Sequence, residues 1–180
     1  IEDFPFVART QQLGVPDEIV LDTFLNQLNR FRKPFFAMCL TQSTHEPYDI
    51  PCNKWTLSDE KRYAHACRYL DSSLQHFMEK AKHQKWFKQT IWIITADHAH
   101  IHPYNYEPGS LERFHIPFLI LSPYLKPMYI DTSMHPVIDQ TDIPMTLLRQ
   151  LNYRPVGFKW SKNYFNPYQQ KFTFSTFING

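Results

Sequence analysis

Hydrophobic residues in this chain form short unbroken runs that alternate with longer segments of helical period. The unbroken runs occupy residues 34–41, 91–96 and 116–122. Runs of this length and β propensity are typical of strands covered on both faces, as in a parallel sheet. We therefore predict three buried strands.

The segments with helical period lie between and after these runs. Asp17 and Glu18 are acidic residues of the kind that favour a helix start, and the helix is predicted to extend to about residue 32. Ser58 is a candidate N-cap for a long helix to residue 81, and a third helix is predicted near residues 142–151. Strands alternating with helices predict a layered α/β fold. A short edge strand is also expected at residues 171–177.

Composition narrows the class of protein. A chain of 180 residues with 43% hydrophobic and 16% aromatic residues is not disordered. The net charge of +2 gives no case for a nucleic-acid partner. The three cysteines form no CxxC pair, which argues against a thiolate zinc site. No apolar run reaches the length of a membrane span, and because the chain opens at Ile1 we expect it to be part of a longer protein.

The end of the second apolar run carries the strongest chemical signal. Asp97 and His98 directly follow it, where α/β proteins bind ligands, and they offer a carboxylate oxygen and an imidazole nitrogen to a divalent cation. His100 and His102 extend the same loop as further candidate ligands. The competing interpretation is that Asp97 caps a turn and the histidines are ordinary surface residues.

Five blocks of the chain resemble the sulfatase-like catalytic domain of the alkaline phosphatase superfamily, in the branch of lipoteichoic acid synthases, phosphoglycerol transferases and phosphoethanolamine transferases. The blocks are Pro34-Phe35-Phe36-Ala37 with Thr41-x-Ser43-x-His45-Glu46-Pro47-Tyr48, Tyr69-x-Asp71-x-x-Leu74, Thr90-x-x-Ile93-Ile94-x-Ala96-Asp97-His98, Arg113-x-His115-Ile116-Pro117 and Gln140-x-Asp142-Ile143. The resemblance implies a layered α/β/α sandwich with a largely parallel central sheet, like that of alkaline phosphatase.

The resemblance also implies roles for single residues. Asp97 and His98 would be metal ligands, and His45 would contact the phosphate or sulfate of the substrate or bind a second metal. His115 is a weaker candidate for contacting the substrate or a metal. The resemblance implies Mn, Zn, Mg or Ca as the cation. One imidazole and one carboxylate do not distinguish among these four metals.

The family's nucleophile, a Thr, Ser or formylglycine, and an acidic metal ligand are not recognisable in residues 1–32. Residues 1–180 are therefore expected to be the C-terminal part of one catalytic domain, present as a partial domain and inactive alone. The full-length protein would be a metal-dependent sulfuric or phosphoric ester hydrolase, or a phosphoglycerol or phosphoethanolamine transferase, acting through a covalent enzyme intermediate.

The resemblance implies a sulfate or phosphate ester as the substrate, with lipid-linked and glycan-linked esters among the candidates. Relatives imply a membrane anchor through N-terminal spans absent from this segment, with the catalytic domain extracellular or periplasmic. Two alternatives stay open. One is a non-catalytic descendant that binds an anionic glycan or lipid head group. The other is an unrelated metal hydrolase with a self-contained site of His98, His100, His102 and His115.

Overall fold

The computed structural model describes residues 14–51, 57–104, 106–107, 109–135, 137–170 and 172–174. Contacts divide the chain into two compact units, Ile1–Leu125 and Lys126–Gly180. Cys39 and Cys67 carry free thiols, and Cys52 lies outside the described residues. No helix among the described segments has the length and apolar character required to cross a bilayer.

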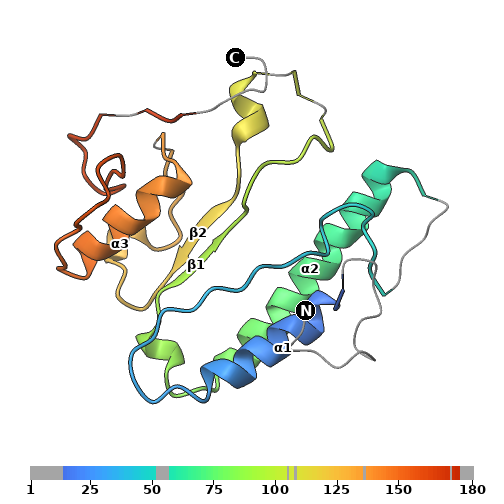
Figure 1. The fold of residues 1–180 in the computed structure, drawn as a ribbon, viewed down its shortest axis with the longest axis horizontal. Coiled ribbons are helices and arrows are strands. Elements are labelled where there is room, and N and C mark those ends of the chain that lie inside the picture. The colour runs from blue at the N-terminus through green and yellow to red at the C-terminus, as the bar shows by residue number, and fades with distance from the viewer. Residues whose placement is uncertain are drawn as a thin grey trace. The chain divides into compact units, whose positions relative to one another are not determined.

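Two packed helices form the core of the first unit (Figure 1). They are α1, Asp17–Leu28, and α2, Asp59–Ala81. The α1 side chains buried in this core are Leu21, Leu25 and Leu28, which meet Phe77 and Ala81 of α2. Burial of each large aliphatic side chain contributes roughly 1.5–3 kcal/mol. The predicted α2 is confirmed, whereas α1 ends at Leu28 instead of residue 32 and leaves Phe31 51% exposed.

Two of the predicted strands form and pair with each other (Figure 1). They are β1, Trp92–Thr95, and β2, Phe118–Leu121. Their pairing is antiparallel, with Trp92 opposite Leu121 and Thr95 opposite Phe118. The mixed α/β character is therefore confirmed. The largely parallel sandwich is not, because the chain reverses direction between these strands and they form the one sheet found in the described residues.

The third predicted strand, residues 34–41, is extended but has no strand partner in the described structure. Its side chains nevertheless alternate as a strand requires. Phe35, Ala37 and Cys39 pack against the helical core. The alternate side chains point away from it, and Phe36, Met38 and Leu40 are 86%, 82% and 68% exposed. These three side chains form an exposed apolar face in the described part of the first unit.

Trp92 packs strand β1 against α2 and the residues that follow that helix. The indole ring lies 5.6 Å from the Phe77 ring of α2, and 5.8 Å and 5.7 Å from the rings of Trp86 and Phe87. Edge-to-face and tilted aromatic pairs of this kind add to the free energy gained from burial. They fix the start of β1, and therefore the point at which the chain leaves the strand after Thr95.

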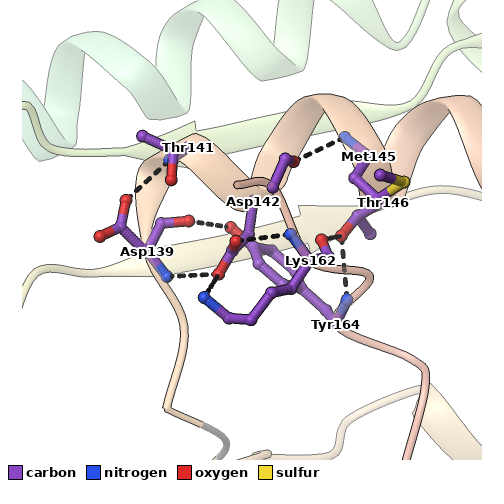
Figure 2. Close-up of polar contacts among 8 residues, drawn as sticks. Asp139, Thr141, Asp142, Met145, Thr146, Lys162 and Tyr164 are labelled. Atoms are coloured by element: carbon purple, nitrogen blue, oxygen red, sulfur yellow. Dashed lines mark hydrogen bonds and ion pairs between the residues drawn. The ribbon is translucent and has the colours of Figure 1, made fainter. Parts of the chain in front are cut away.

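In the second unit, α3, Ile143–Gln150, confirms the predicted third helix. Asp142 directly precedes this helix, and its buried carboxylate contacts Asp139 and Lys162 (Figure 2). Asp142 accepts hydrogen bonds from the backbone N–H groups of Lys162 at 2.7 Å and Asp139 at 3.0 Å. It also forms a 2.9 Å ion pair with the Lys162 ammonium group. Of the edge strand expected at residues 171–177, only 172–174 are described, and they form no strand.

Replacing Asp142 by Ala should destabilise the second unit strongly. The change leaves the Lys162 ammonium, whose side chain is 7% exposed, without its counter-charge. Removing one partner of a buried ion pair typically costs about 3–5 kcal/mol. The matched control is Lys80→Ala, which breaks a half-exposed ion pair with Asp22 and should cost about 1 kcal/mol or less. Urea unfolding of both variants checks this, and equal losses of unfolding free energy would refute it.

Candidate functional site

Asp97 and His98 lie two and three residues beyond the end of β1, as the sequence predicted. Their side chains are 70% and 72% exposed, so both are accessible to a ligand. The Asp97 carboxylate accepts a 2.9 Å hydrogen bond from the His98 backbone N–H. Asp97 therefore does hold a turn, as the competing interpretation expected, but only one carboxylate oxygen makes this bond.

The second oxygen of Asp97 faces the His98 ring. The distance from Asp97 Oδ2 to His98 Nε2 is 3.7 Å. His98 Nδ1 lies 2.9 Å from the carbonyl oxygen of Ala99, so the proton must be on Nδ1, because a carbonyl can only accept. In the neutral ring Nε2 then carries a lone pair that can bind a metal ion. A metal-binding histidine typically donates its other N–H to such a carbonyl.

This pair of atoms suits a divalent cation. Two ligands about 2.1 Å from a tetrahedral metal lie roughly 3.4 Å apart, which is close to the observed separation. Within the described part of the chain, however, no group of three or more His, Cys, Asp or Glu side chains is placed to hold a metal. Asp97 and His98 can therefore supply part of a coordination shell. The same finding weighs against a self-contained site of four histidines.

A cavity of about 490 Å³ adjoins this pair. One wall comes from α2, including Tyr63, Cys67 and Asp71, and the other from the loops around His98 and His115. Four of the predicted histidines, at positions 98, 100, 102 and 115, line it, whereas Asp97 and His45 do not. Among its described lining residues, Asp71 and Glu112 are carboxylates and none is Lys or Arg. The cavity wall is thus acidic and aromatic.

His100 has no free ring nitrogen in this arrangement. The backbone N–H of His102 donates to His100 Nδ1 at 3.1 Å, so the ring proton is on Nε2. Nε2 lies 2.9 Å from the Tyr48 hydroxyl oxygen and donates to it. Burial and the neighbouring His102 hold the pKa of His100 below its ordinary value, so the ring is neutral at pH 7. His100 would have to give up a hydrogen bond to bind a metal.

His45 lies on a different loop, which follows the extended segment 34–41. Its ring is exposed, and Nδ1 lies 2.6 Å from the carbonyl oxygen of Glu46, which again leaves Nε2 free. The buried Asp17 at the start of α1 anchors this loop. Its carboxylate accepts hydrogen bonds from the backbone N–H groups of Gln42 at 2.9 Å and Ser43 at 3.0 Å.

The other two candidates have less defined surroundings. His102 is half-buried, with its ring 6.2 Å from the Tyr63 ring. His115 is exposed on the segment that leads into β2. The sequence predicted no functional role for Tyr63, Asp71 or Glu112, yet all three line the cavity. The signal that pointed to Tyr63 and Asp71 was their position on the face of α2 that carries its recurring apolar residues.

Comparison with known proteins identifies the family of this chain. Residues 4–153 match the sulfatase family. The chain is 27% identical to the lipoteichoic acid synthase-like YvgJ of Bacillus subtilis (strain 168) over 107 residues, 54% of this chain and 17% of that protein. It is 26% identical to lipoteichoic acid synthase 1 of the same organism over 93 residues, 48% of this chain and 15% of that protein.

The alignments thus span less than a fifth of either relative's length. No solved structure matches the chain significantly. The sulfatase match nevertheless covers most of the chain, including the Asp97–His98 pair, the His45 loop and the segment before β2. From the ordered blocks and this match, the chain belongs to the sulfatase family.

Proposed function

We propose that this chain is the C-terminal part of the catalytic domain of a metal-dependent ester-processing enzyme. The full-length protein would hydrolyse a sulfuric or phosphoric ester, or transfer a phosphoglycerol or phosphoethanolamine group. The observation that carries the proposal is the Asp97–His98 pair, whose Oδ2 and Nε2 atoms lie 3.7 Å apart beside a cavity in a sulfatase-family chain. The relatives named as lipoteichoic acid synthases support the transferase branch.

In this proposal Asp97 Oδ2 and His98 Nε2 hold one cation, with His100 and His102 as the weaker ligand candidates. A bound divalent cation would lower the pKa of a hydroxyl nucleophile and polarise a phosphoryl or sulfuryl oxygen. His98 is oriented for ligation because its Nδ1 proton is committed to Ala99. The exposed Nε2 of His45 would contact a non-bridging oxygen of the substrate or exchange a proton with the leaving group.

The cavity would receive the alcohol portion of the ester. Carboxylates such as Asp71 and Glu112 accept hydrogen bonds from hydroxyl groups, and aromatic rings such as Tyr63 and Tyr104 pack against the C–H faces of a polyol or sugar. The same carboxylates would repel a second anionic group. The substrate proposed here therefore carries a single anionic group, held at the cation, on a glycerol-, ethanolamine- or glycan-like alcohol.

The nucleophile and an upstream acidic ligand would come from a preceding half of the same domain. Two observations support a preceding half. The relatives are far longer than the matched segment, and the row of Phe36, Met38 and Leu40 exposes an apolar face that a neighbouring strand would cover. We further propose, from the family resemblance, that N-terminal spans anchor the protein with this domain outside the cytoplasm.

The proposal is tested by comparing the full-length protein with residues 1–180 on chromogenic phosphate and sulfate esters, with Mn²⁺ content measured in parallel. Turnover should occur only in the full-length protein. Which ester reacts separates phosphate from sulfate chemistry. Stoichiometric Mn²⁺ without any turnover would instead favour a non-catalytic descendant that binds an anionic glycan or lipid head group.

In the full-length protein, Asp97→Asn and His98→Ala should each weaken Mn²⁺ binding by more than about 100-fold, because each removes a direct ligand. Isothermal titration with Mn²⁺ measures the dissociation constants. The control is His76→Gln, which changes an exposed histidine on α2 and should leave binding unaltered. Wild-type affinity in both site variants would exclude this pair as the cation site.

His45→Ala should separate binding from turnover. Removing a proton donor or substrate contact should lower kcat by about 10²- to 10⁴-fold. Mn²⁺ content should stay at the wild-type level if His45 contacts only the substrate. Loss of one metal equivalent in the variant would show that His45 is a ligand of a second cation, and an unchanged kcat would remove it from the site.

A further inference from the structure

We propose that Tyr48 is a positioning residue that couples the loop carrying His45 to the loop carrying Asp97 and His98. This inference rests on the proposed function, because it concerns the site to which that function assigns these side chains. Tyr48 is absent from the described cavity lining, so it is not placed to touch a substrate there. Its effect would come through His100, two residues beyond His98.

A one-way chain of hydrogen bonds connects the two loops. The His102 backbone N–H donates to His100 Nδ1 at 3.1 Å, and His100 Nε2–H donates to the Tyr48 oxygen at 2.9 Å. The Tyr48 hydroxyl then donates to Glu46 Oε1 at 3.2 Å. In each of these three hydrogen bonds a donor faces an acceptor. The backbone of its own loop therefore sets the tautomer of His100. The ring proton on Nε2 points to Tyr48 in the other loop.

Packing holds the hydroxyl in place. Tyr48 is fully buried, and Tyr63 of α2 stacks on the His100 ring at 4.0 Å with an interplanar angle of 13°. The rings of Tyr48 and Tyr63 meet edge-on at 5.7 Å. Both loops are thus pressed against the same helix. Tyr48 adopts a left-handed backbone conformation with φ of 59°, which a bulky residue rarely does without compensating contacts.

The Tyr48 hydroxyl keeps its proton over the physiological pH range. Burial, with a further contribution from the nearby Glu46 carboxylate, raises the pKa of Tyr48 to about 12. The protonated hydroxyl can therefore both accept from His100 and donate to Glu46. Replacing it by hydrogen would leave the His100 Nε2–H without its acceptor, so that only the His102 N–H and the stacking on Tyr63 would hold the ring.

Tyr48→Phe in the full-length protein tests the coupling, because it removes the hydroxyl and retains the ring. Hydrogen exchange in residues 42–50 and 97–104 should accelerate in both loops by about five- to tenfold, the factor expected for one lost hydrogen bond. The Mn²⁺ dissociation constant should rise by about tenfold, as for the loss of an outer-shell contact. Exchange in α1 and in the C-terminal half of α2 should not change.

The matched control is Tyr69→Phe, which removes the hydroxyl of a partly buried tyrosine on α2, where it accepts from the Glu18 backbone N–H at 3.5 Å. It should alter neither loop nor Mn²⁺ binding. In a His100→Phe background, Tyr48→Phe should have no further effect on the 97–104 loop, because the two residues would act through one contact.

The outcomes separate this inference from the proposed function. Wild-type exchange in the 97–104 loop of Tyr48→Phe would overturn the coupling, whether or not the protein binds metal. A wild-type protein that binds no Mn²⁺ would overturn the proposed cation site, while the exchange data would still decide the coupling.

Discussion

Packing of Trp92 against aromatic side chains of α2 and of the segment after it fixes the position of β1. The position of β1 in turn determines where the candidate residues of the 97–104 loop lie. The strand is only four residues long and has one partner within the described residues, so pairing alone would hold it weakly. Its contacts with Phe77, Trp86 and Phe87 supply the rest. Asp97 and His98 can therefore be exposed and still emerge from an anchored strand.

The loop beyond β1 would be held at a second point by His100. The histidines of this region differ in what their δ nitrogen does. In His98 and His45 this nitrogen donates to a carbonyl of the next residue, which leaves Nε2 as a free ligand. In His100 it accepts from the backbone, so that the ε proton must find an acceptor, and Tyr48 provides it. Local backbone geometry thus leaves His98 and His45 available as ligands, whereas it makes His100 an anchor of the loop.

Much of this could be predicted from sequence. The apolar run at residues 91–96 predicted β1, and the position of Asp97 and His98 after it followed directly, because a strand's end is readable from the change to polar residues. The antiparallel pairing could not be predicted, since strand direction depends on the path of the loop at residues 96–117. Tyr48 appeared in a family-like block, but only the fold shows that its hydroxyl reaches His100, 52 residues away.

The central claim is that Asp97 and His98 share one cation. It is tested most directly by a crystal structure of the full-length protein grown with Mn²⁺, with anomalous scattering recorded at the manganese edge. The account predicts an anomalous peak about 2.0–2.3 Å from both Asp97 Oδ2 and His98 Nε2, with an acidic ligand from outside residues 1–180. A peak bound instead by His100, His102 and His115, or no peak in a protein that turns over its substrate, would contradict it.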